Sequence, residues 1–183
     1  MMELSVSAQV DKRHELVVGL GVITSNDVID MSSDLFETIF TLGGVTYDDI
    51  YTFPALNLGY KYPLTEEWFS LFEVSYQNIE KDMYQHSEYV SNVKGYFLSV
   101  GAGVSYLYVS NDWLQIYSGL SIAYTFIWDV LSNEEMRSEN DKRYLMNIQF
   151  NAIGIRAGKR LGVFFELGMG YKGIANLGAS YQL

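Results

Sequence analysis

Residues 161–183 read LGVFFELGMGYKGIANLGASYQL, and apolar side chains occupy every second position in two parts of this stretch. These positions are Val163, Phe165, Leu167, Met169 and Tyr171 in the first part, and Ala175, Leu177, Ala179, Tyr181 and Leu183 in the second. Most of the positions between them hold glycine or polar residues. A period of two places alternate side chains on opposite faces of a β-strand. The stretch therefore predicts two short strands with one apolar face and one small, polar face.

The same alternation recurs along the rest of the chain and predicts six further strands. Their approximate bounds are 15–25, 50–62, 68–78, 93–109, 113–130 and 143–158. The connections are short turns at 63–67, 110–112, 159–160 and 172–174, and long polar loops at 26–49, 79–92 and 131–142. An even number of strands, with tight turns at one end and long loops at the other, is typical of transmembrane β-barrels. We expect residues 14–183 to form an all-β fold, an eight-stranded antiparallel up-and-down transmembrane β-barrel.

Two local signals refine the first half of the chain. Apolar residues at helical spacing after the N-cap candidates 32–34 predict a short helix over 34–40, which the glycine pair 43–44 would end. Pro54 lies within a predicted strand, although proline has no N–H to donate to a neighbouring strand. We expect Pro54 to lie beyond the membrane, either at a bulge or where its strand extends past the end of a neighbouring strand.

Acidic residues are concentrated in the predicted long loops. The net charge is −10, and the whole excess of acid lies within 26–50, 79–92 and 129–143. No basic patch exists, so the sequence predicts no nucleic-acid partner. The chain has no cysteine, which excludes disulfides, thiol nucleophiles and Cys-ligated metals.

The first thirteen residues, MMELSVSAQVDKR, lie outside the barrel pattern. Val6, Ser7 and Ala8 before Gln9 resemble the end of a signal peptide, which has small residues at its cleavage site. Residues 1–13 are therefore either a signal-peptide remnant or an ordinary disordered N-terminus.

Alternation does not by itself say which face of the barrel points outward. A soluble lipocalin-like barrel would turn its apolar face inward. Its outer face would then be the glycine and polar set, which carries few charges for a surface in water. Bands of Trp and Tyr near both ends of the apolar face favour the two interfaces of a bilayer instead. The predicted girdle is Tyr62, Trp68, Trp113 and Tyr181 at the turn end, and Tyr76, Tyr96, Tyr124 and Trp128 at the loop end.

The repeated G-x-G-x strands and the ending GYKGIANLGASYQL resemble the small bacterial outer-membrane β-barrel family, with the transmembrane domain of OmpA and with OmpX as familiar types. The resemblance implies the outer membrane of a Gram-negative bacterium, signal-dependent export, insertion by the barrel-assembly machinery and contact with outer-membrane lipids. We expect a monomer. The last residue is Leu183, where the family usually ends on an aromatic residue.

The predicted inward face carries few charges, chiefly Lys61, Glu73, Glu166 and Lys172. The candidates for ion pairs in the lumen are Lys61, Glu73, Arg156 and Glu166. The apolar parity changes near 152–154, which predicts a β-bulge that turns Arg156 inward. Lys61 and Glu73 lie on neighbouring strands, as do Arg156 and Glu166. Because buried charges must be paired, we expect an internal ion-pair network rather than a gated polar pore.

The sequence holds weak signals for chemistry. Gln85-His86-Ser87-Glu88, in the second long loop, contains the residue types of acyl transfer on the side of the outer-leaflet lipid. Adjacent residues in a loop rarely form that geometry, and the resemblance supplies no catalytic motif. The acidic loops show no calcium-binding spacing, so we expect a solvated anionic surface with no metal or other cofactor.

The sequence thus favours a non-enzymatic outer-membrane barrel with a structural or surface-binding role. Loop tyrosines are suited to contact an extracellular ligand or protein, because tyrosine is favoured in recognition surfaces. These tyrosines are Tyr47, Tyr51, Tyr84 and Tyr89. The alternatives are a lipid A-modifying enzyme, a narrow porin-like channel and, least favoured, a soluble lipocalin-like barrel.

Overall fold

The computed structural model describes residues 14–43, 45–86, 88–131 and 143–183. The predicted N-terminal segment 1–13 and nearly all of the predicted loop 131–142 lie outside these ranges. The described chain contains one helix and nine strands. They are β1 (Glu15–Val22), α1 (Ser25–Phe40), β2 (Val45–Thr52), β3 (Ala55–Pro63), β4 (Trp68–Gln85), β5 (Glu88–Ser110), β6 (Leu114–Leu131), β7 (Arg143–Gly158), β8 (Leu161–Gly170) and β9 (Ala175–Gln182).

Eight of these strands form a closed antiparallel barrel, as predicted. Consecutive strands from β3 to β9 pair with one another, and β1 closes the ring by pairing with both β9 and β3. The ninth strand, β2, lies end to end with β3, and both pair with the same edge of β4. Pro54 falls in the two-residue break between β2 and β3, where no ladder hydrogen bond is required of it.

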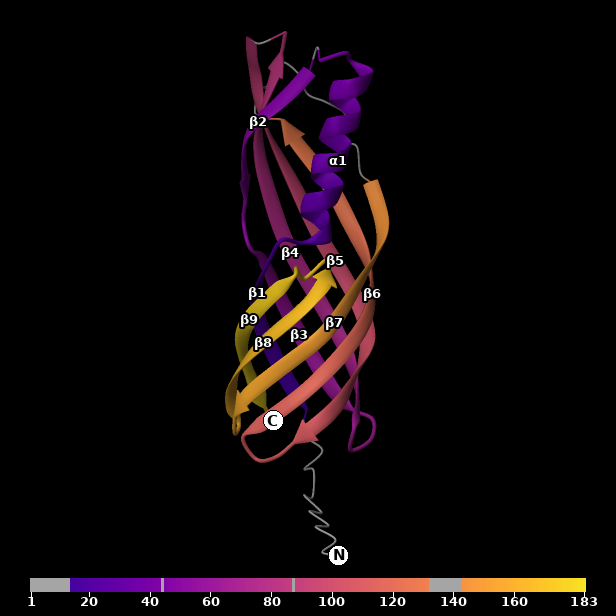
Figure 1. The fold of residues 1–183 in the computed structure, drawn as a ribbon, viewed down its shortest axis with the longest axis vertical. Helices are drawn as coiled ribbons and strands as arrows, with labels where there is room; N and C mark the ends of the chain where they lie inside the picture. The colour runs from indigo at the N-terminus through magenta and orange to yellow at the C-terminus, as the bar shows by residue number, and fades with distance from the viewer. Residues whose placement is uncertain (1–13, 44, 87, 132–142) are drawn as a thin grey trace, which may run out of the picture.

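The barrel continues on one side into an upper extension, which consists of β2, residues 79–85 of β4, residues 88–95 of β5, and α1. Figure 1 shows this extension rising beyond the ends of β8 and β9, with α1 standing beside the long strands. The first residues of β1 and the C-terminus lie at the opposite end of the molecule (Figure 1).

The prediction of a long polar loop over 79–92 was wrong. β4 continues to Gln85 and β5 begins at Glu88, so this segment is a β-hairpin. Its polar composition resembles a loop, but alternation continues through it: Lys81 is buried, whereas Glu80 and Asp82 are not. The hairpin is held by β2 along one edge and by α1 against its inner face, and both partners are distant in sequence.

The first predicted loop, 26–49, is also mostly regular structure. The predicted helix 34–40 is part of a longer helix that begins at Ser25, so the N-cap predicted at 32–34 was wrong. The N-cap is Thr24, which forms a capping box with Asp27: the Thr24 side chain accepts from the Asp27 N–H, and the Asp27 carboxylate accepts from the Thr24 N–H. The helix ends at Phe40, and Gly43 follows in a left-handed conformation with φ of 80°.

The apolar face of the barrel points outward and the polar face points inward. On β1, Leu16, Val18 and Leu20 are each about half exposed, whereas Glu15 is 3% exposed. The same division holds around the barrel. Outward apolar residues include Leu58, Phe72, Val100, Leu120, Ile122, Ile148, Phe165 and Leu177, and buried inward residues include Ser75, Ser99, Ser121, Thr125, Gln149, Asn151, Asn176 and Ser180.

The predicted bulge in β7 is present. The register against β8 shifts between Asn151 and Ile153, so that Asn151 and Arg156 both face the lumen although their parity differs. Small apolar clusters lie inside the barrel toward its two ends and enclose the polar middle of the lumen. They are Phe69, Leu107 and Tyr117 at the turn end, and Ile79, Phe97 and Ile127 toward the upper extension.

Candidate functional site

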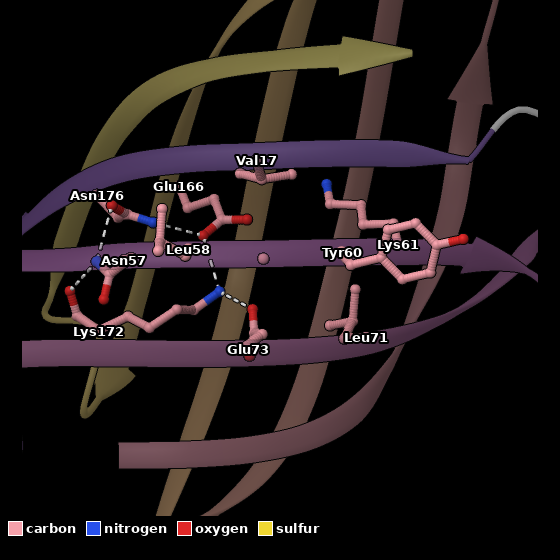
Figure 2. A pocket seen from close by; sticks show the side chains of 11 residues that line it. Val17, Asn57, Leu58, Tyr60, Lys61, Leu71, Glu73, Glu166, Lys172 and Asn176 are labelled. Carbon is pink, nitrogen blue, oxygen red and sulfur yellow. Dashed lines mark hydrogen bonds and ion pairs between the residues drawn. The ribbon is translucent and has the colours of Figure 1, made fainter. Parts of the chain in front are cut away.

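A buried charge network fills the middle of the lumen around Lys172. Its amino group lies 2.6 Å from Glu73 Oε1 and 3.2 Å from Glu166 Oε2, and all three side chains are almost fully buried. Figure 2 shows the amino group between the two carboxylates. The Tyr171 hydroxyl donates to Glu73 at 2.8 Å, and the Tyr117 hydroxyl donates to Glu166 at 2.9 Å. Each buried carboxylate thus has an ammonium partner and at least one additional hydrogen-bond donor.

The turn between β8 and β9 places Lys172 in this position. β8 ends at Gly170, after which Tyr171 and Lys172 both fold into the lumen. The Lys172 amide donates to Gln149 Oε1 at 2.8 Å. A side chain at Gly21 would place its Cβ 1.6 Å from the Lys172 carbonyl oxygen, so the turn requires glycine at that point of β1.

A second buried network lies toward the turn end around Arg156. The Arg156 Nε donates to Glu15 Oε1 and to Ser180 Oγ, each at 2.7 Å. Its terminal nitrogens donate to the carbonyl oxygens of Gly158 and Lys159, at 2.6 Å and 2.7 Å. Arg156 therefore ties β1 to β9 and to the β7–β8 turn.

The four lumen residues named from the sequence pair differently from the prediction. Glu73 and Glu166 share Lys172 as their partner, and Arg156 pairs with Glu15. Lys61 is opposite Leu71 rather than Glu73 in the strand register, and its amino group lies over the Tyr117 ring, 4.0 Å from the centroid. Side chains cross the interior of a narrow barrel, so pairing is not restricted to neighbouring strands.

A small cavity adjoins this network. It has a volume of about 20 Å³, and its lining includes Asn57, Lys61, Glu73, Glu166 and Lys172 (Figure 2). This is room for about one water molecule. The buried Asn57 Oδ1 has no hydrogen-bond partner among the described residues.

The first turn of α1 closes the upper mouth of the barrel. The Thr24 hydroxyl donates to Gln77 Oε1 at 2.7 Å, and Asn26 Nδ2 donates to the same oxygen at 3.2 Å. Asn147 Nδ2 donates to Asn26 Oδ1 at 3.3 Å from the other side of the mouth. Thr24, Asn26 and Gln77 are each 1% exposed, so this polar contact excludes solvent.

Further along α1, two carboxylates share one buried ammonium. Lys81 Nζ lies 3.1 Å from both oxygens of Asp30 and also pairs with Asp34. The Tyr47 ring lies beneath the ammonium at 4.6 Å. Burial raises the pKa of Asp30 and of Asp34 above the ordinary value, and the ammonium of Lys81 opposes that shift. We call Lys81, Asp30 and Asp34 the helix latch.

The predicted aromatic girdle lies on the outside of the barrel. Six of its members are exposed by 41–59%, while Tyr96 and Trp128 are partly exposed and stack on each other with ring centroids 5.8 Å apart. The six are Tyr62, Trp68, Trp113, Tyr181, Tyr76 and Tyr124. Trp68 also meets Tyr106 edge to face at the turn end.

The residues considered for catalysis or recognition lie in the β4–β5 hairpin and on β2. His86, with φ of 50°, and Glu88 lie at the tip of the β4–β5 hairpin, and Ser87 is outside the described residues. Tyr47 belongs to the packing of α1, since its hydroxyl donates to Glu37 at 2.6 Å. Tyr51 is 66% exposed and Tyr89 is 57% exposed, and Tyr84 contacts Tyr89 edge to face.

Over the described ranges, no group of three or more His, Cys, Asp or Glu side chains is placed to hold a metal ion. The helix that the structure describes is not long and apolar enough to cross a membrane. Comparisons with protein-family models, with curated proteins and with solved structures found no match.

Proposed function

We propose that the chain is a non-enzymatic integral outer-membrane protein whose eight barrel strands cross the bilayer and whose upper extension has a structural or surface-binding role outside the cell. One observation carries this proposal: apolar side chains cover the outside of the barrel, while the charged and polar side chains are buried inside it. A protein surface of this extent and apolarity requires a lipid or protein neighbour.

The dimensions of the barrel agree with a bilayer. The shorter strands β1, β3, β8 and β9 have 8, 9, 10 and 8 residues, close to the roughly 9–11 residues that a tilted strand needs to cross the hydrocarbon core. Exposed Trp and Tyr flank this zone at both ends, where the interfaces of the bilayer would lie. A lipocalin-like protein would instead line its interior with apolar side chains, whereas the middle of this interior is charged and polar.

Two features support a role other than transport or catalysis. The lumen is filled by the Lys172 and Arg156 networks, and the adjoining cavity of about 20 Å³ has no room for a hydrated ion. His86 follows β4, which runs nine residues beyond the girdle residue Tyr76 to Gln85, roughly 30 Å of strand. That position is remote from the acyl chains of an outer-leaflet lipid, so a lipid A-modifying function of His86 has no geometric support.

The upper extension is the part that is suited to binding. It presents exposed aromatic residues, such as Tyr51 and Tyr89, on a regular framework of strands and a helix. The acidic residues of α1 are a smaller part of that surface than the sequence predicted, because Asp30 and Asp34 are held by Lys81. We include membership of the small outer-membrane barrel family, and insertion by the barrel-assembly machinery, in the proposal.

The test is gel mobility of the chain in an outer-membrane fraction, with boiled and unboiled samples side by side. We expect a heat-modifiable band, because a closed barrel resists detergent until it is boiled.

A matched pair of variants sharpens the test: Ile122→Arg places a charge in the middle of the outward apolar face, and Thr46→Arg places the same charge on β2 in the upper extension. Arginine at the bilayer midplane costs about 2–4 kcal/mol, so Ile122→Arg alone should reduce the folded band. Equal amounts of the folded band from both variants would contradict a membrane location. So would a chain found in the soluble fraction whose gel mobility does not change on boiling.

A further inference from the structure

The small cavity beside Lys172 is lined by polar groups that the buried network does not satisfy. It has a volume of about 20 Å³, and its lining includes Asn57, Gly59 and Lys61 of β3 (Figure 2). Gly59 is paired with β1 on one side and with β4 on the other. Because glycine has no side chain, this point of the inner wall leaves space that a larger residue would fill. We call this space the Asn57 cavity.

Neighbouring groups fix the orientation of the Asn57 amide. Asn176 Nδ2 donates to Glu166 Oε2 at 3.0 Å, so Asn176 presents its Oδ1 to Asn57. Asn57 Nδ2 donates to that oxygen at 3.2 Å and to the Lys172 carbonyl oxygen at 3.4 Å. A flipped amide would place Asn57 Oδ1 against two other acceptors. The oxygen therefore faces away from both, and it has no partner among the described residues.

The unpaired oxygen of Asn57 is a costly feature unless a donor reaches it. Asn57 is 4% exposed, so bulk solvent does not hydrate its side chain. A buried acceptor without a partner has lost its hydrogen bonds to water and gained none in the protein, which is why native structures rarely leave one. The oxygen needs a donor small enough for the Asn57 cavity.

Two ammonium groups at the cavity have N–H groups to spare. An ammonium has three N–H donors. Lys172 Nζ directs two of them to Glu73 and Glu166. Lys61 Nζ lies over the Tyr117 ring, and it forms no hydrogen bond or ion pair within the described part of the chain. The two lysine charges and the two carboxylate charges of the lining cancel, so the cavity has no net charge that would select an ion.

We propose that the Asn57 cavity binds one ordered water molecule, which donates to Asn57 Oδ1 and accepts from the remaining N–H of Lys172. A cavity of about 20 Å³ fits a single water, and the lining supplies the two to four polar partners that a buried water needs. Water both donates and accepts, so it satisfies the amide oxygen and an ammonium at once. A cation would satisfy only the oxygen, and an anion only the ammonium. The water thereby joins Asn57 of β3 to the Lys172 network.

The variant Gly59→Ala tests the site through stability. The added methyl group would lie 3.5 Å from Val17 Cβ and 3.8 Å from the Phe72 carbonyl oxygen, so it fits without moving a neighbour. It leaves no room for the water, and Asn57 Oδ1 then stays buried without a donor. We expect the urea midpoint for unfolding of the purified, folded chain to fall. In a dry cavity the same methyl would fill space and restrict the unfolded chain, and the midpoint would rise.

The matched control is Gly119→Ala on β6. Its added Cβ would also have no contact shorter than 3.4 Å, and Gly119 does not line the Asn57 cavity. This variant removes the same backbone freedom from the unfolded chain and displaces no water. Its urea midpoint should therefore stay unchanged or rise.

A crystal structure of the purified barrel, at a resolution that shows ordered waters, tests the site without any substitution. We expect one peak within hydrogen-bond distance of both Asn57 Oδ1 and Lys172 Nζ, and no such peak in Gly59→Ala. A map without the peak would overturn the inference, as would a peak whose contacts identify an ion. A midpoint of Gly59→Ala that does not fall below that of Gly119→Ala would also overturn it. The site requires only the closed barrel, so none of these results bears on the proposed membrane location.

Discussion

Arg156 is 1% exposed, and its charge is neutralised by one carboxylate, that of Glu15. Replacing one member of a buried ion pair leaves the other charge uncompensated in a medium of low polarity, at a cost of about 3–5 kcal/mol. We therefore expect Arg156→Met to lower the free energy of unfolding by this amount, measured by urea titration of the barrel folded in detergent micelles. The double variant Arg156→Met/Glu15→Gln removes both charges and should regain much of that loss. A double variant as unstable as the single one would show that the hydrogen bonds to Gly158 and Lys159 matter more than the charge.

The position of Arg156 was predictable, but its partner was not. The change of apolar parity after Ala152 is a local signal, and it correctly predicted the bulge and the inward side chain. Glu15 is 141 residues away in sequence and meets Arg156 only after the barrel has closed. Tyr171 was assigned to the outward face by its parity, but the strand ends at Gly170 and the following turn buries it. Alternation holds only while the strand continues.

Helix α1 shows why an element is harder to predict than a side chain. Its capping box at Thr24 and Asp27 is visible in the sequence, but the apparent continuation of the first strand to residue 25 concealed it. Its apolar spacing predicts a helix over 34–40, and the apolar side of a surface helix ordinarily packs on the protein. The structure has the reverse orientation, because the buried partners Gln77, Lys81 and Asn147 are polar. Those partners come from β4 and β7, which no local pattern links to the helix.

The helix latch makes the docking of α1 depend on pH. Burial raises the pKa of Asp30 and of Asp34 in the folded protein above the ordinary value of 3.8. A raised carboxyl pKa means that the docked helix binds protons more readily than the free helix. The resulting stabilisation is complete below the ordinary pKa and is lost as pH rises through the folded pKa. One carboxylate suffices to neutralise Lys81, so protonation of the other leaves the ammonium paired.

We therefore expect α1 to be docked at least as firmly in mild acid as at neutral pH. Hydrogen exchange of peptides covering residues 25–40 should show equal or greater protection near pH 5 than near pH 7, after correction for intrinsic exchange rates. The variant Asp30→Asn removes one buried carboxylate and should weaken the pH dependence. Clearly lower protection at pH 5 would mean that the ion pairs with Lys81 outweigh the cost of burying two carboxylates.

For the whole molecule, alternation and the composition of the two faces were sufficient to predict a closed eight-stranded barrel. A period of two fixes which residues share a face, and two aromatic bands on one face indicated which face points outward. Buried ion pairs in the lumen were predictable, but their pairing was not, because the Lys172 network joins β4, β8 and the β8–β9 turn. The extension beyond the barrel was not predictable either, since its strands have the composition of loops.

The contacts inside the lumen predict which residues block the passage of ions through the barrel. The first turn of α1 covers the mouth through Gln77 and Asn147, but the Lys172 network closes the lumen independently below it. Replacing residues 25–40 by a short Gly-Ser linker should therefore leave the protein as silent as the intact chain in planar-bilayer recordings, with a porin as the conducting control. The folded state of the shortened chain is checked by its heat-modifiable band. Discrete current steps from the shortened chain, and none from the intact one, would identify α1 as the gate of a pore and restore the channel as the leading function. Silence from both would place the seal at Lys172, Glu73 and Glu166, as the contacts of these side chains predict.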